Sequence, residues 1–285
     1  MDRDVTIRFY EIQPTGNGGL TLEDVLRHLD ELPKRDRESD VANSIVLRLE
    51  HLEERDGLFL GDITRVQTQN LPGHVTDEEN DRLPVNQIGH PAAFCFDPET
   101  NCIALQFDIK IGIGRVCDYF KTFADGNAFG HMPILQPDAL DRFENETPKR
   151  LTVKVARRRN FENAESQLTD FEEMIERMGA WFGAPGVEIT VSCRASDEGI
   201  NKERAVDTIR RWLGLRDEIE GINKISGATI ESDEAFNFIK FLLKEHETLD
   251  LPDNDPLDGR RRRIRHLRTK YAQHRAYLRE FTGAA

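Results

Sequence analysis

Two pairs of apolar segments, each pair joined by a short turn, constrain the fold of this chain more than any other feature. Residues 44–54 and 58–67 flank the turn sequence ERDG, and residues 90–96 and 101–111 flank the sequence DPET. An Asp-Gly pair between two strand-like segments is typical of a β-hairpin, in which the strands run antiparallel. The sequence therefore predicts two hairpins, in a mixed or antiparallel sheet, in the first half of the chain.

The pattern of elements changes near residue 148, where the polar sequence ENETPKR precedes a new strand-like segment. Residues 1–147 are expected to form a β-rich α+β domain, with a helix over 22–32 that Thr21 caps. Residues 148–285 are expected to form an α/β domain that ends in a long, basic, amphipathic helix. The predicted fold class is therefore α+β, with two lobes.

The overall composition limits both the location and the partners of the protein. The 285 residues carry a formal net charge of −13, and such a surface repels phosphates, so any contact with nucleic acid must be local. We find no signal peptide, no apolar run of about 18 residues that would span a membrane, and no CxxC spacing among the four cysteines. We therefore expect a cytoplasmic protein with reduced thiols, no inserted membrane segment and no cofactor.

The end of the chain reverses this charge. Residues 259–281, GRRRRIRHLRTKYAQHRAYLREF, contain eight Arg and one Lys against one Glu. On a helix, residues at alternating spacings of three and four form one seam, which suits packing or dimerisation. The seam consists of Ile264, Leu267, Tyr271, His274, Leu278 and Phe281. The candidate phosphate-binding residues beside it are Arg261, Arg262, Arg265, Arg268 and Arg275.

A second basic concentration lies on the strand-like residues 148–159. Because side chains alternate along a strand, Arg150, Lys154 and Arg158 project to one face, opposite an apolar face. Arg binds phosphate oxygens in a bidentate manner, so both basic surfaces are candidates for nucleic-acid binding. The alternative is that the terminal helix packs on its own acidic body, or on a second subunit, through its seam and through ion pairs.

Two short motifs in the sequence suggest a catalytic role instead. Arg268 and His274 have the R-x5-H spacing that resembles the motif of the HEPN ribonuclease family, although chance matches are expected in so Arg-rich a segment. Asp97 with Asp108-x-Lys110 resembles a restriction-type nuclease signature, but the expected hairpin separates the two carboxylates by roughly 20 Å. Two ligands of one metal ion must lie much closer. We therefore assign no catalytic residue and no metal site.

Three segments resemble the RexA and KwaB-like proteins of phage exclusion and anti-phage defence. They are the hairpin HPAAFCFDPETNCIALQF, the strand RLTVKV, and the region GATIES…FIKFLLKEHETLDL before a final helix. The resemblance implies a cytoplasmic homodimer that binds DNA with little sequence preference beside a membrane-protein partner from the same operon. It also favours a strand for residues 236–250, which by periodicity alone are open between strand and helix. The family supplies no catalytic residue that matches this chain.

The leading hypothesis is a non-enzymatic, dimeric component of a bacterial or phage defence system that binds nucleic acid, above all DNA, through local basic patches. A metal-independent ribonuclease that uses Arg268 and His274 is the second hypothesis. A protein-interaction module, whose acidic body meets a basic partner, is the third.

Overall fold

The chain is described by a computed structural model in which two compact units can be distinguished. Unit 1 comprises Met1–His131 and Lys244–Ala285, and unit 2 comprises Met132–Leu243. The C-terminal segment thus belongs to the first unit, whereas the sequence analysis placed it in a domain that begins at residue 148. The residues that the structure describes are 2–15, 19–41, 45–75, 80–82, 85–108, 110–137, 145–156, 174, 177–178, 181–184, 186–193, 199–215, 222–231, 236–252 and 255–284.

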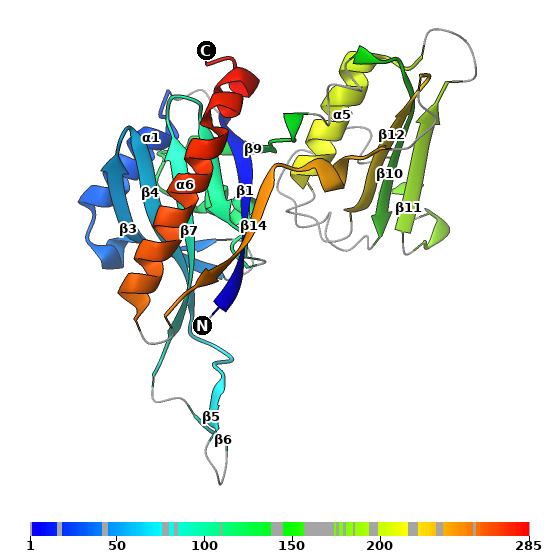
Figure 1. The fold of residues 1–285 in the computed structure, drawn as a ribbon. Helices are drawn as coiled ribbons and strands as arrows, with labels where there is room; N and C mark the ends of the chain where they lie inside the picture. The colour runs from blue at the N-terminus through cyan, green and yellow to red at the C-terminus, as the bar shows by residue number, and fades with distance from the viewer. Residues whose placement is uncertain are drawn as a thin grey trace. The chain divides into compact units, whose positions relative to one another are not determined.

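Unit 1 is built on an antiparallel sheet (Figure 1). Its strands are β1 (Asp2–Thr15), β2 (Glu38–Val41), β3 (Ile45–Arg55), β4 (Leu58–Gln67), β7 (Ile88–Asp97), β8 (Cys102–Gln106), β9 (Ala128–Pro133) and β14 (Lys244–Asp250). They follow the order β14-β1-β8-β7-β4-β3-β2, and β9 also pairs with β1. The short strands β5 (Gly73–Val75) and β6 (Asn80–Arg82) pair with each other.

The pairing of β14 with β1 explains why the C-terminal segment joins unit 1. The two strands run antiparallel, from Asp2 opposite Asp250 to Arg8 opposite Lys244. This ladder joins segments that are more than 230 residues apart in the sequence. No local pattern indicates such a partner, so the sequence alone placed the segment with its neighbours in the chain.

Both predicted hairpins are present. β3 and β4 pair antiparallel as far as Arg55 opposite Leu58, and β7 and β8 pair antiparallel as well. Asp56 and Gly57 in the first turn have positive φ angles of 54° and 76°. Gly adopts this conformation without strain and Asp tolerates it, so the Asp-Gly pair specifies the turn.

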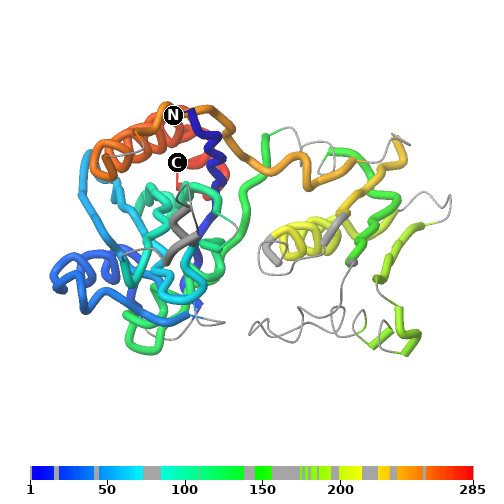
Figure 2. The backbone as a smooth tube through the Cα atoms, turned by 90° about the horizontal axis from the view of Figure 1, so that it is seen from below, coloured from blue at the N-terminus to red at the C-terminus, as the bar shows by residue number. Residues whose placement is uncertain are grey.

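Helices cover both faces of the sheet in unit 1. α1 (Leu22–Glu31), the short η1 (Lys34–Arg37) and α2 (Ile113–Lys121) pack over one face. The core beneath them includes Leu26, Phe94 and Tyr119, all fully buried. The long α6 (Pro256–Thr282) contacts β4, β7, β8 and β14. Figure 2 shows α6 and α1 on opposite sides of the sheet, so unit 1 has three layers.

The start of α1 lies where the sequence predicts it. The Oγ1 atom of Thr21 accepts a hydrogen bond from the Asp24 backbone N–H at 3.2 Å, and the Asp24 carboxylate accepts one from the Thr21 N–H at 2.9 Å. This capping box satisfies donors that a helix N-terminus leaves unpaired. The apolar face of the helix, Leu22, Val25, Leu26 and Leu29, is buried.

Unit 2 has its own antiparallel sheet, with strands in the order β11-β10-β12-β13. Its elements are β10 (Pro148–Ala156), β11 (Gly186–Ser192), α5 (Lys202–Leu215), β12 (Ile222–Thr229), β13 (Phe236–Asn237) and η3 (Phe238–Phe241). Leu151, Val153 and Val155 of β10 pack in one core with Ile209 and Trp212 of α5. Because β13 and β14 flank the single turn of η3, the ambiguous segment 236–250 is mainly extended, as the family resemblance favoured.

The architecture is α+β, with antiparallel sheets and a long C-terminal helix, as the sequence predicts. In the described part of the chain, none of the helices combines the length and the apolar composition that a membrane crossing requires. The four cysteines form no disulfide. Burial raises the pKa of Cys95, and raises that of Cys102 to about 12, so both thiols stay uncharged at neutral pH.

Candidate nucleic-acid interface

The basic segment forms α6, and both of its ends have clear signals. The Asp255 carboxylate accepts hydrogen bonds from the backbone N–H groups of Leu257 and Asp258, both at 3.0 Å. Pro256 occupies the first turn, where its missing N–H has no cost. Gly283 ends the helix in the left-handed conformation, with φ of 70°. The sequence break that precedes the Arg run is therefore the N-cap of a helix of 27 residues.

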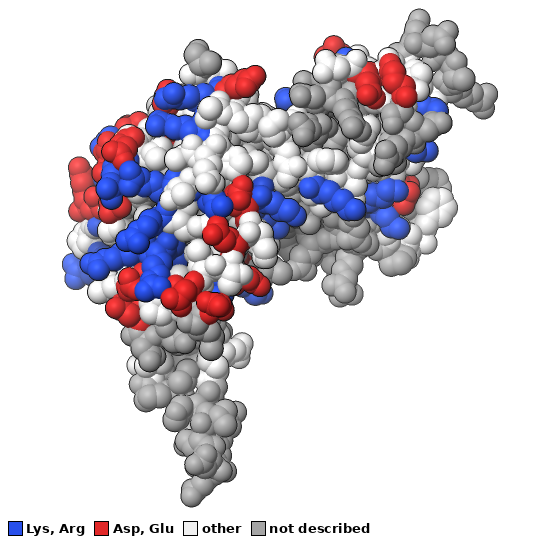
Figure 3. Space-filling model, in the orientation of Figure 1, with Lys and Arg blue, Asp and Glu red and all other residues white. Residues whose placement is uncertain are grey.

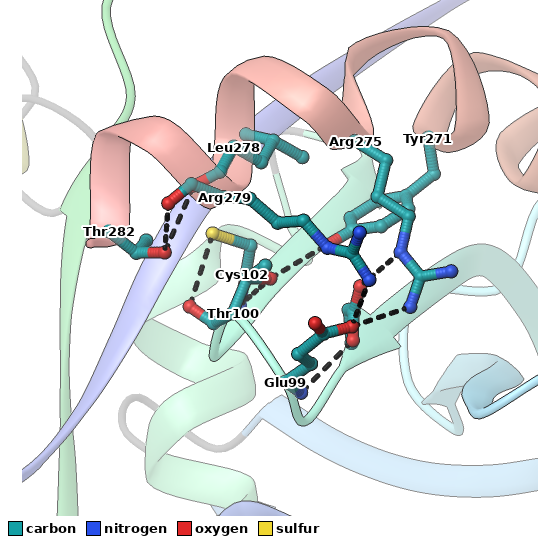
Figure 4. Close-up of polar contacts among 9 residues, drawn as sticks. Glu99, Thr100, Cys102, Tyr271, Arg275, Leu278, Arg279 and Thr282 are labelled. Carbon is teal, nitrogen blue, oxygen red and sulfur yellow. Dashed lines mark hydrogen bonds and ion pairs between the residues drawn. The ribbon is translucent and has the colours of Figure 1, made fainter. Parts of the chain in front are cut away.

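The predicted apolar seam packs α6 onto the sheet of its own unit. Leu267, Tyr271 and Leu278 are completely buried and Ile264 is nearly so, whereas His274 and Phe281 are half-buried. The Tyr271 hydroxyl is hydrogen-bonded to the Thr100 hydroxyl at 2.8 Å, as Figure 4 shows. Most of the seam is thus used within the chain, so the expected homodimer needs another surface.

The last turns of α6 are fixed by ion pairs to the hairpin β7–β8 (Figure 4). The Arg275 guanidinium donates to Asp97 and to Glu99, both at 3.0 Å, and Arg279 donates to Glu99 at 2.6 Å. Asp97 is fully buried, and Arg275 supplies the hydrogen-bonded partner that a buried carboxylate requires. The hydrogen bond from Arg279, with further charges from Arg279 and Arg275, lowers the pKa of Glu99.

The middle of α6 pairs with acidic residues of the β3–β4 turn and of the edge strand β14. On one side, Arg268 forms an ion pair with Asp56 in the β3–β4 turn. On the other, Lys270 lies 3.4 Å from Glu245 and 3.0 Å from Glu247 of β14. Near the start of the helix, Arg262 lies 2.8 Å from both Asp250 and Asp258. The predicted binding residues Arg262, Arg268 and Arg275 are therefore already engaged within the protein.

The remaining arginines of the predicted stripe are in a different state. Arg261 and Arg265 are exposed, and neither guanidinium has an ion-pair partner among the residues that the structure describes. Arg260, which was not among the predicted binding residues, is half-buried, and its guanidinium also has no ion-pair partner among the described residues. Figure 3 views the face of unit 1 that α6 covers, and it shows Lys and Arg along the helix with Asp and Glu beside them. The cations that remain available lie in the first half of α6.

The ribonuclease pair does not form a common site within one chain. The His274 Nε2 atom lies 2.7 Å from the Oε1 atom of Glu245 in β14. The imidazole ring packs edge-on against the ring of Phe9, with 5.1 Å between the ring centroids. Arg268 instead points to the turn after β3. Because β1, β8 and β7 lie between β14 and β4, the two partners sit on strands roughly 19 Å apart. In this structure Arg268 and His274 therefore have separate partners and form no common site within one chain.

The second basic surface is only partly described. Arg150 and Lys154 are exposed on β10, opposite its buried apolar face, as the alternation predicts. The Lys154 Nζ atom lies 3.7 Å from Glu188 of β11. Arg158 lies outside the described residues. Both placed cations belong to unit 2, so this strand is a separate candidate from α6.

The nuclease signature does not form a metal site either. Asp97 ends β7 and binds Arg275, whereas Asp108 follows β8 at the far end of the hairpin and accepts a hydrogen bond from the Lys110 backbone N–H at 2.7 Å. Within the described ranges, no group of three or more His, Cys, Asp or Glu side chains lies close enough together to hold a metal ion.

One ion pair beneath α6 was not predicted from the sequence. Arg263 donates to Asp62 of β4 at 3.1 Å, and both side chains are more than nine-tenths buried. Burial raises the pKa of Asp62, and the charges of Arg263 and Arg260 oppose this change. The signal in the sequence is that Asp62 interrupts the apolar segment LFLGDITRV, which requires a buried cation on some other element.

Comparison with protein families and with curated proteins found no match to this chain.

Proposed function

We propose that this protein is a non-enzymatic, cytoplasmic component of a phage-defence system that binds nucleic acid, above all DNA, through the first half of α6. The state of Arg261 and Arg265 carries the proposal. Both are exposed and lack an ion-pair partner in the described part of the chain, on a helix whose other arginines are mostly paired. Exposed arginines without a counter-ion are free to bind phosphate in a bidentate manner.

The spacing of these two residues suits a phosphate backbone. They lie one turn apart on the same face, so their Cβ atoms are about 5–6 Å apart. Duplex DNA presents one charge for about every 1.7 Å of its axis, so two such arginines reach neighbouring phosphates. Contacts to phosphate alone carry no base information. This agrees with the low sequence preference that the resemblance to the RexA and KwaB-like proteins implies.

The binding is expected to be weak for a single chain. Two phosphate contacts work against a net charge of −13. A homodimer would present α6 twice on one DNA molecule, and the second contact would then gain from a high effective concentration. The same family resemblance supports the homodimer, the role in defence and a membrane-protein partner encoded in the same operon.

The salt dependence of DNA binding tests the proposal. A fluorescently labelled duplex of mixed sequence is titrated with the protein at several salt concentrations from 50 mM upward. The double substitution Arg261→Gln with Arg265→Gln should weaken binding and should reduce the slope of log K against log salt by about 1.8, since each phosphate contact contributes about 0.9. A duplex of unrelated sequence should give the same affinity.

A matched control separates this local effect from the change in net charge. Lys34→Gln with Arg35→Gln removes the same two charges from η1, where both side chains are largely exposed. This variant should keep the wild-type affinity and slope. If both double variants behave alike, or if the wild type does not bind DNA at 50 mM salt, the proposal fails and a protein-interaction role for the acidic body replaces it.

The defence role has its own test in cells. Bacteria that express the protein with its neighbouring genes are challenged with phage, and the efficiency of plating is measured. The α6 double variant should lose protection while the η1 double variant keeps it. Equal protection by both would separate defence from nucleic-acid binding by α6.

A further inference from the structure

A cavity lies beneath the first turns of α6, between the helix and the strands β3, β4 and β7. Its volume is about 270 Å³, which corresponds to roughly nine water molecules at their share of the liquid volume. This is just below the range of pockets that hold small ligands, so it suits one flat ring system better than a large molecule. All of its walls belong to unit 1, and none of them is needed for the phosphate contacts of Arg261 and Arg265.

The wall of the cavity contains a hydrogen-bond acceptor that nothing satisfies. Asp62 is 3% exposed, and its Oδ2 atom accepts a hydrogen bond from Arg263. Its Oδ1 atom is buried and has no hydrogen-bond partner in the described part of the chain. The Nε atom of Arg263 beside it is likewise buried without a hydrogen-bond partner among the described residues. Unsatisfied polar atoms are costly when buried, so this acceptor and donor in a cavity wall point to a polar ligand that donates an N–H or O–H to Asp62.

The rest of the lining is mixed. Its polar part includes Thr64, Gln87 and the ion pair of Arg48 with Glu50. Arg260 contributes a guanidinium group without an ion-pair partner among the described residues. The apolar side chains of Ile88, Pro91 and Leu257 form other parts of the wall. The cavity thus offers an acceptor on the buried carboxylate, apolar walls and an available cation.

This combination excludes the simplest ligands. A bare phosphate ion would be repelled by the carboxylates of Asp62 and Glu50, and an organic cation would be repelled by Arg260 and Arg263. The ligand must instead carry a neutral N–H donor on an apolar, flat body and an anionic group at its other end. A nucleotide has this composition: its base stacks on apolar side chains and donates from its Watson–Crick edge, and its phosphate binds Arg.

We propose that this cavity binds a single nucleotide, with the base against Asp62 and the apolar walls and the phosphate at Arg260. If the nucleotide is part of a DNA strand bound by α6, this inference rests on the proposed function. If it is a free mononucleotide, which has the same chemical groups, the inference is independent of that function. A single acceptor oxygen does not select one base, since every standard base has an N–H donor on that edge. A nucleic acid that enters the cavity must be a single strand or a frayed end, because a paired base cannot enter.

Calorimetric titration with adenosine 5′-monophosphate, ribose 5-phosphate and inorganic phosphate tests the cavity itself. The mononucleotide should bind in a saturable manner, and ribose 5-phosphate, which lacks the base, should bind at least tenfold more weakly. A labelled single strand and the matching duplex are titrated in parallel. The single strand should bind more tightly than the duplex.

Two variants address the cavity without removing its buried ion pair. Leu257→Trp fills the space from a side chain that is 56% exposed, and Arg260→Gln removes the available cation. Each should weaken mononucleotide binding at least tenfold and should keep the wild-type thermal unfolding. Arg261→Gln, outside the cavity lining, is the matched control and should leave mononucleotide binding unchanged.

The outcomes separate this proposal from the proposed function. If mononucleotide binding depends on Leu257 and Arg260 but no DNA strand binds, the cavity proposal is supported with a free nucleotide as the ligand. The proposal that α6 binds DNA then fails. The cavity proposal is overturned if the protein binds no mononucleotide at millimolar concentration while DNA binding depends on Arg261 and Arg265 and is unchanged in Leu257→Trp. The proposed function then still stands. Equal binding of the mononucleotide and ribose 5-phosphate also overturns the cavity proposal.

Discussion

The two halves of α6 use their arginines differently. From the middle of the helix onward, each Arg that follows the seam pairs with an acidic residue of the same unit: Arg268 with Asp56, Arg275 with Asp97 and Glu99, and Arg279 with Glu99. In the first half, only part of the Arg run has such partners within the described residues. Arg262 and Arg263 are paired, whereas Arg260, Arg261 and Arg265 are not.

The number of charges on a helix therefore does not predict the role of each charge. Successive residues of a helix point about 100° apart, so neighbours in the run RRRR face the sheet, the helix edge or the solvent. An arginine that forms an ion pair with an acidic residue of the same protein contributes to stability. An arginine without such an ion pair is available to bind a ligand. Substitutions in the two groups should therefore differ in what they change.

The largest effect is expected from the buried pair. Arg263→Ala leaves the Asp62 charge beneath α6 without its cation, and removing one partner of a buried ion pair typically costs about 3–5 kcal/mol of unfolding free energy. Urea denaturation measures the loss. Replacing both residues together, Asp62→Leu with Arg263→Met, should restore much of it. A single variant as stable as the wild type would mean that the pair is not formed in solution.

A smaller effect is expected at the end of the helix. Arg275→Ala leaves the carboxylate of Asp97, which is 0% exposed, without a cation, and should cost about 1–3 kcal/mol. Arg279→Ala removes a contact only to Glu99, which is exposed, so its cost should be clearly smaller. Denaturation of the two variants side by side measures the difference. Equal costs would contradict the role given to burial.

A still smaller effect depends on pH. Because Arg279 and Arg275 lower the pKa of Glu99, the unfolded chain binds a proton at this residue more readily than the folded protein does. The stability that Glu99 contributes is therefore present above its ordinary pKa of 4.5 and is lost as the pH falls through the lowered value. The melting temperatures of wild type and Glu99→Gln should differ at neutral pH and converge in acid. A constant difference would exclude the ion pair as the cause.

Local features of the sequence were sufficient for much of the fold. The Asp-Gly turn at Asp56 and Gly57 and the cap at Thr21 follow from turn and helix chemistry, and the seam from Ile264 to Leu278 follows from helical periodicity. Each of these signals lies within a few residues of the element that it specifies. They were predicted because no distant part of the chain is needed to interpret them.

The candidate site could be predicted only in part, because the partners of the arginines lie far away in the sequence. Asp62 and Asp97 are 201 and 178 residues from the arginines that they bind, and Asp56 is 212 residues from Arg268. The sequence alone does not distinguish the arginines of the basic segment that form ion pairs from those that do not. Only the tertiary fold divides them into paired and available groups.

The smallest effect on stability is expected from the available group. Arg261→Gln with Arg265→Gln should change the free energy of unfolding by no more than about 0.5 kcal/mol, because neither side chain has an ion-pair partner to lose in the described part of the chain. The same variant should show the largest loss of DNA affinity at low salt. Urea denaturation and DNA titration of one preparation measure both quantities. A marked loss of stability would show that these arginines do have partners within the protein, and the difference between the two halves of α6 would then disappear.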